Sequence, residues 1–121
     1  MTMRQALFRL LTPAAIVLPL LAGPVTPAAA SDNAAAGQKV AFDRKKGNCL
    51  ACHMMGDGAL PGNIGPPIIA MKARFPDRAK LRAQIWDPTI KNPNSLMPPF
   101  GKHGILSEKE IDLIVDYVLT L

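Results

Sequence analysis

Cys49-Leu50-Ala51-Cys52-His53 is the stretch of this 121-residue chain on which its fold depends. The pattern Cys-x-x-Cys-His is the attachment signature of a c-type haem. Two thiols at this spacing can add to the two vinyl groups of one haem, and the next histidine can bind the iron as its proximal ligand. The stretch therefore predicts one covalent haem c on Cys49 and Cys52, with His53 as an axial iron ligand. A bound redox-active iron makes electron transfer the first function to consider.

Three other interpretations of the cysteines remain open. A thioredoxin-like dithiol needs strands that alternate with helices, and the chain has almost no strand pattern. A structural zinc site needs four ligands, which only Cys49, Cys52, His53 and His103 could supply, and the adjacent Cys52 and His53 would have to converge on one small ion. A disulfide across two residues would be strained. The haem interpretation fits the residues best.

The second axial ligand decides what the iron can do. A methionine gives an electron carrier of high potential, a histidine lowers the potential, and an open position invites small ligands. Met54 and Met55 cannot reach the opposite haem face, because one or two residues span only about 4–7 Å. Met97 lies far downstream in a proline-rich loop, which can hold a weak thioether ligand in place. We expect Met97 to be the ligand, and His103, Met71 or an open site are the alternatives.

The proximal histidine also needs a partner for its second ring nitrogen. A hydrogen bond from that N–H to a carbonyl fixes the tautomer of a ligating histidine. The loop after the motif contains Ile64-Gly65-Pro66-Pro67, whose prolines would hold a carbonyl still. The expected acceptor for His53 is therefore the carbonyl of Pro66.

The N-terminus has the features of a secretory signal peptide. Arg4 and Arg9 form a basic region, an apolar run follows from residue 10 to 23, and three alanines at 28–30 offer a cleavage site. The run contains prolines and is shorter than the about 20 residues of a membrane-spanning helix, although an uncleaved anchor is the alternative. We predict a cleaved Sec-type signal at 1–30, a single domain at 31–121, no membrane span after cleavage, and export to the periplasm.

Charge and size limit the function further. Without Arg4 and Arg9 the formal net charge falls from +5 to +3, and the basic residues lack interleaved aromatic side chains. Neither feature favours nucleic-acid binding. A small domain buries only a modest fraction of its surface, so a covalent haem would supply much of the apolar core.

The remaining pattern predicts an all-α domain. Helices are expected over residues 34–46, over 67–75, over 78–86 with Asp77 as N-cap, and after Ser107, where Ser107 and Glu110 form a capping box. Residues 56–67 and 92–101 are expected to be loops because they are rich in glycine and proline. Gly37 would let a residue such as Tyr117 approach the first helix closely.

The order of these segments resembles a class I cytochrome c. Longer strings resemble the SoxX family, the small monohaem subunit of the SoxAX cytochrome of bacterial thiosulfate oxidation. These strings are Gly47-Asn48 before the motif, Gly62-Asn63-Ile64-Gly65-Pro66-Pro67, Met71-Lys72-Ala73-Arg74-Phe75-Pro76-Asp77-Arg78, Trp86-Asp87, and Met97-Pro98-Pro99-Phe100-Gly101-Lys102-His103. The resemblance covers about residues 37–121 and implies a small helical cytochrome c domain wrapped around one haem.

The resemblance also implies a partner and a reaction. SoxAX is an L-cysteine S-thiosulfotransferase, which joins thiosulfate to a cysteine of the SoxYZ carrier and releases two electrons. This chain would be the electron-accepting subunit of a heterodimer with a SoxA-like cytochrome, in transient contact with a SoxYZ-like carrier and a downstream electron acceptor. No catalytic residue is expected here, because haem attachment would use both cysteines of the chain.

A freestanding periplasmic electron shuttle is the main alternative, and an enzyme or gas sensor with an open iron is a weaker one. A permanent partner would cover exposed apolar surface. The sequence suggests such surface at residues 68, 69 and 98–100, which are Ile68, Ile69, Pro98, Pro99 and Phe100.

Overall fold

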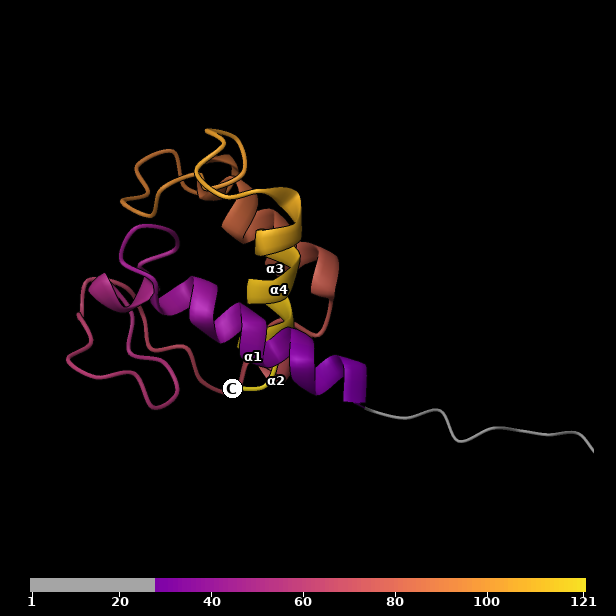
Figure 1. Cartoon of the computed structure of the whole chain (residues 1–121). Coiled ribbons are helices and arrows are strands. Elements are labelled where there is room, and N and C mark those ends of the chain that lie inside the picture. Colours follow the sequence, from indigo (N-terminus) through magenta and orange to yellow (C-terminus); the bar gives the residue numbers. More distant parts are fainter. Residues whose placement is uncertain (1–27) are drawn as a thin grey trace, which may run out of the picture.

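The computed structural model describes residues 28–121, and within this range every regular element is helical (Figure 1). The elements are α1 (Ala28–Phe42), the 3₁₀ turn η1 (Cys49–Ala51), α2 (Met71–Arg74), α3 (Arg78–Trp86), the 3₁₀ turn η2 (Pro88–Ile90) and α4 (Glu108–Val118). Between residues 28 and 121 the sole β-type pairing is an isolated bridge that joins Met55 and Ile68. The all-α prediction is confirmed. Most of the predicted signal peptide, residues 1–27, lies outside the described residues.

The first helix lies further toward the N-terminus than the predicted range 34–46. It begins at Ala28 and continues through Ser31–Asn33, residues that often cap helices. Alanine has a high helix propensity, and the alanines on both sides of this segment extend the helix across it. It ends at Phe42, four residues earlier than predicted. Asp43 turns the chain there, since its carboxylate accepts the N–H of Lys45 at 2.8 Å and its carbonyl accepts the N–H of Lys46 at 3.0 Å.

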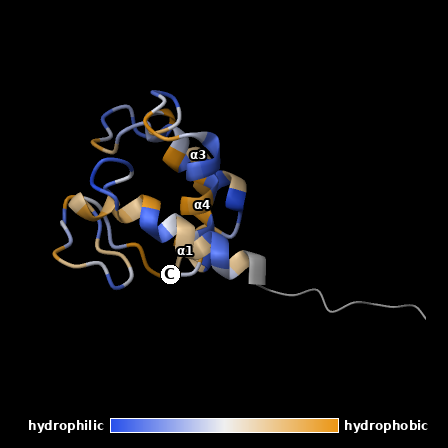
Figure 2. Cartoon of the chain, viewed as in Figure 1, coloured by the Kyte–Doolittle hydropathy of each residue, from blue (hydrophilic) through white to orange (hydrophobic). Residues whose placement is uncertain are grey.

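Helix α4 is the central element of the core. The predicted capping box is present: the Ser107 hydroxyl accepts the Glu110 N–H at 3.3 Å, and the Glu110 carboxylate accepts the Ser107 N–H at 3.0 Å. The apolar side of α4 lies between α1 and α3, as the hydropathy colouring shows (Figure 2). Its buried side chains are those of Ile111, Ile114, Val115, Tyr117 and Val118.

Gly37 allows α1 and α4 to pack backbone to backbone. A Cβ at this position would lie 1.9 Å from the Leu113 carbonyl oxygen and 3.0 Å from Tyr117 Cβ. The close approach expected for Tyr117 is therefore present, and the α4 backbone at Leu113 comes closer still. At the end of α1, the ring of Phe42 packs edge-on against that of Tyr117, with centroids 5.9 Å apart.

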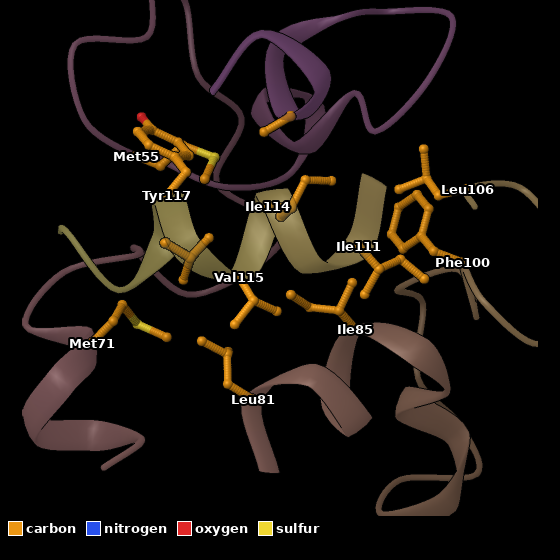
Figure 3. Close-up of a cluster of buried hydrophobic side chains, with 12 residues drawn as sticks. Met55, Met71, Leu81, Ile85, Phe100, Leu106, Ile111, Ile114, Val115 and Tyr117 are labelled. Carbon is orange, nitrogen blue, oxygen red and sulfur yellow. The ribbon is translucent and has the colours of Figure 1, made fainter. Parts of the chain in front are cut away.

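The other helices complete the core from below α4 (Figure 3). Helix α3 begins where predicted, because the Asp77 carboxylate accepts the Ala79 N–H at 2.8 Å, and it buries Leu81 and Ile85. The helix predicted at 67–75 is shorter, since Ala70 has a positive φ of 51° and α2 begins only at Met71. Within residues 28–121 no helix is both long and apolar enough to cross a membrane.

Candidate functional site

A cavity of about 820 Å³ opens beside the Cys-x-x-Cys-His stretch. This volume lies in the range of about 300–1,000 Å³ that is usual for small-molecule and cofactor sites. The cavity is mainly apolar, and residues from the methionine loop (residues 89–102) and from α3 and α4 meet the haem motif around it. Its apolar walls include Ile64, Ile68, Met71, Phe75, Leu81, Ile85, Phe100, Ile105, Ile114 and Val118.

The backbone of the motif is a tight turn that presents both cysteines to this cavity. Asn48 enters the turn in the left-handed conformation (φ 47°), and the Cys49 carbonyl accepts the N–H of Cys52 at 3.2 Å and that of His53 at 2.9 Å. Cys49 and Cys52 are not joined by a disulfide, and both line the cavity. Burial raises the pKa of the Cys49 thiol to about 11, in keeping with its apolar surroundings.

The ring of His53 is held from behind by the loop that follows the motif. Its Nδ1 lies 2.7 Å from the Pro66 carbonyl oxygen, the contact expected from the sequence. Because a carbonyl can only accept, Nδ1 is the donor in this contact, so in the neutral ring Nε2 is the nitrogen left to bind a metal. Gly65 lies against the same ring, since a Cβ on it would be 2.3 Å from His53 Cε1. The Gly65 N–H donates to the Cys52 carbonyl at 2.8 Å and ties the loop to the motif.

Among the candidates for the second ligand, Met97 is the one in the methionine loop that also lines the cavity. Its N–H donates to Ser95 Oγ at 3.2 Å, which orders the backbone before the prolines. Met71 also lines the cavity, but it is 2 % exposed and packs in the hydrophobic core. His103 is exposed and does not line the cavity. Met54 is half exposed, and Met55 is buried in the core beside the motif.

These residues fit a covalent haem and do not fit the alternatives. Two thiols, an imidazole with a free Nε2 and a thioether border one apolar cavity, which is the donor set of a c-type haem. In the described part of the chain no group of three or more His, Cys, Asp or Glu side chains could hold a metal ion. A zinc site is therefore not supported by the geometry.

Comparison with known proteins places the fold. A family model described as cytochrome C oxidase, cbb3-type, subunit III matches residues 32–118. The chain belongs to this cytochrome c family. It has the class I cytochrome c-like fold, and Cys49 and Cys52 have the spacing that fits one covalent haem c.

The structure is also similar to the crystal structure of SoxXA from P. pantotrophus. The TM-score is 0.65 at 26 % sequence identity, over 73 % of this chain and 80 % of that one. Together with the family match, this similarity makes the chain a SoxX-like monohaem cytochrome. An "uncharacterized lipoprotein" of Aquifex aeolicus (strain VF5) is 41 % identical over 76 residues, which are 61 % of this chain and 36 % of that protein. The chain thus spans about a third of that relative's length.

Two groups of residues at the site were not recognised from the sequence. Arg44, Lys45 and Lys46 border the cavity just before the motif, and Lys46 is paired with Glu110 at 2.5 Å. Three consecutive basic residues next to the motif were a signal that could have indicated positive charge at the edge of the site. Ile114 and Val118 belong to the buried face of α4, and they also border the cavity. The helical periodicity of apolar residues does not distinguish side chains that pack in the core from side chains that line a cavity.

The predicted apolar surface is only partly correct. Ile69 is 54 % exposed and Pro98 is exposed, while Ile68 and Pro99 are half-buried. Phe100 is 7 % exposed and lies in the core beside Leu106 (Figure 3), so its assignment to the surface was wrong. Its carbonyl also accepts the N–H groups of Ile105 and Leu106, which folds the chain over the ring.

Proposed function

We propose that this chain is the electron-transfer subunit, SoxX-like, of a SoxAX-type complex that oxidatively conjugates thiosulfate to a carrier-protein cysteine. The observation that carries the proposal is that both motif cysteines, His53 and Met97 border one and the same apolar cavity. A thioether and an imidazole together suit an electron carrier of raised potential. The similarity to SoxXA supports the choice of complex.

In this proposal each residue at the site has a defined task. When bound, the haem supplies a one-electron redox centre. Cys49 and Cys52 would attach it, and His53 Nε2 and Met97 Sδ would bind its iron. The Pro66 carbonyl accepts from His53 Nδ1, which would leave Nε2 available to the iron and raise its basicity. The apolar walls exclude water, which limits the solvent reorganisation that accompanies electron transfer.

The sulfur chemistry is assigned to a partner subunit. The chain contains two cysteines, and both belong to the haem motif, so no thiol remains to carry sulfur. The partner would be a SoxA-like cytochrome in a heterodimer, with a SoxYZ-like carrier and a downstream acceptor as transient contacts. As an isolated chain it would transform no substrate. Export to the periplasm through a cleaved Sec-type signal, residues 1–30, is part of the same proposal.

Exposed apolar side chains around the motif support a permanent partner. Leu60 is 93 % exposed and Ile69 is 54 % exposed, and neither borders the haem cavity. A permanent partner could cover these side chains, since obligate interfaces bury apolar surface. A freestanding electron shuttle is the second candidate, because a small haem domain with two axial ligands can carry electrons alone.

Purification from the native host separates these two candidates. The tagged full-length chain is isolated from cells grown on thiosulfate, and the gel is stained for covalent haem. The proposal predicts a second, larger haem-bearing band in stoichiometric amount. A single small haem band from a stable monomer would support the freestanding shuttle instead.

A further inference from the structure

Among the residues that the structure describes, Asp87 is the only charged residue that is buried, with 5 % of its surface exposed. It follows α3 directly and lies outside the haem cavity. A buried carboxylate is costly unless charged or hydrogen-bonding groups surround it. The groups that contact the Asp87 carboxylate therefore indicate which parts of the chain it holds together.

Those partners come from both ends of the loop that carries Met97. At the start of the loop, Asp87 Oδ1 accepts the N–H of Thr89 at 3.1 Å and also its hydroxyl. At the end of the loop, Asp87 Oδ2 lies 2.8 Å from Nζ of Lys102. The Lys102 ammonium and the Thr89 groups lower the pKa of the Asp87 carboxyl, so it is charged at neutral pH. One carboxylate thus joins the two ends of residues 89–102.

The residue before Asp87 strengthens the same junction. The Trp86 carbonyl accepts the N–H of Gly101 at 3.1 Å and that of Lys102 at 3.2 Å. The Trp86 ring packs so closely on Gly101 that a Cβ there would lie 2.1 Å from it. The Arg82 guanidinium, one turn earlier in α3, covers this ring at 5.2 Å from the ring centroid.

We propose that the Asp87–Lys102 pair is a clasp that keeps the methionine loop closed, so that Met97 stays on the iron and competing ligands stay out. The clasp rests on the proposed role of Met97 as an axial ligand. Asp87 and Lys102 are positioning residues, because they act on the iron through the loop. A thioether is a weak ligand, and its hold depends on the fraction of molecules in which the loop is closed. Opening one end of the loop lets Met97 leave and an added ligand enter.

Imidazole binding to the oxidised holoprotein tests the clasp. Asp87→Asn keeps the shape and an acceptor for Thr89 but removes the charge that holds Lys102. We expect it to bind imidazole about tenfold more tightly and faster than the wild type, with a weaker methionine–iron absorption band. Lys102→Arg should bind imidazole with an affinity within about twofold of the wild type, since the ion pair with Asp87 is kept. Lys102→Ala, which changes an exposed side chain, should bind imidazole as tightly as Asp87→Asn does. It provides the test if Asp87→Asn yields no holoprotein.

Arg78→Gln is the matched control. It removes the ion pairs of Arg78 with Asp112 and Asp116 between α3 and α4, at 3.3 Å and 2.8 Å, and leaves the methionine loop untouched. It should lower thermal stability without changing imidazole affinity. If Asp87→Asn and Lys102→Ala bind imidazole within twofold of Arg78→Gln, the clasp is wrong and the pair only stabilises the fold. If the oxidised wild-type protein shows no methionine–iron absorption band, Met97 is not an iron ligand, and the clasp proposal is then wrong as well.

Discussion

Gly65 touches the ring of His53, so replacing it with alanine moves this histidine, the proposed axial ligand, without changing any residue proposed to bind the iron. A Cβ on Gly65 would lie 2.3 Å from His53 Cε1 and 2.5 Å from Nδ1, whereas ordinary contacts begin at 3.4 Å. The ring, the loop or both must therefore move by about 1 Å. The movement would lengthen or break the 2.7 Å hydrogen bond from Nδ1 to Pro66 O.

Two contributions set the size of the effect of Gly65→Ala. Overpacking costs about 1–3 kcal/mol, and the lost hydrogen bond costs about 0.5–1.5 kcal/mol. A loss of about 2–3 kcal/mol lowers the Tm of a domain of this size by about 10–20 °C. The histidine also becomes less basic without its acceptor, which disfavours the oxidised iron. The midpoint potential should rise by tens of mV, since a tenfold change in relative affinity corresponds to about 59 mV.

Gly104→Ala is the control for this measurement. Gly104 has φ 63° and nothing within 4 Å of an added Cβ, so alanine there strains only the backbone, by about 1 kcal/mol. Thermal unfolding and redox titration of both holoproteins compare the two. We expect both variants to lose stability and only Gly65→Ala to change the potential. Equal potentials in the two variants would refute the claim that Gly65 positions the His53 ring.

Three further predictions follow from the packing and charges. Gly37→Ala should lower the free energy of unfolding by about 2 kcal/mol, because the clash with Leu113 outweighs the gain in helix propensity. The control Ala35→Gly, at an exposed position of the same helix, should lower it by only about 0.5–1 kcal/mol. Denaturant unfolding would contradict this if Gly37→Ala were as stable as the wild type. Met97→Ala should abolish the methionine–iron absorption band of the oxidised protein, and a band that persists would assign the ligand elsewhere. The pKa of Glu110 is lowered to about 2, first by the hydrogen bond from Lys46 and then by those from Ser107. Because this folded-state pKa lies below the ordinary 4.5, the stabilisation is complete above about pH 4.5 and is lost as the pH falls toward 2. Glu110→Gln should therefore cost about 1 kcal/mol at pH 7 and progressively less below pH 4.5, and a difference that does not change with pH would contradict the assignment.

Local signals in the sequence were sufficient for the parts of the fold that depend on neighbouring residues. The Ser107 capping box and the Asp77 cap each involve side chains within three residues of the backbone they satisfy, and both helices begin where predicted. The haem motif is local for the same reason. The end of α1 was missed, because the Asp43 turn competes with helix continuation through a single carboxylate.

The parts that could not be predicted depend on residues distant in the sequence. Asp87 meets Lys102 only after the methionine loop has folded back, so no periodic pattern marks the pair. The burial of Phe100 depends in the same way on Leu106 and α4, which close over its ring. The shortening of α2 depends on Ala70, whose positive φ comes two residues after Ile68 pairs with Met55 in an isolated bridge. Tertiary contacts decide each of these cases.

The reduction of this chain's haem during turnover is the most direct test of its proposed role as an electron acceptor. The complex that copurifies from the native host is mixed in its oxidised form with thiosulfate and the reduced carrier protein, and haem absorbance is followed by stopped flow. The account predicts that the haem on Cys49 and Cys52 is reduced as the carrier is modified, and that Met97→Ala alters this reduction without altering assembly. A carrier that is modified while this haem stays oxidised would contradict the account.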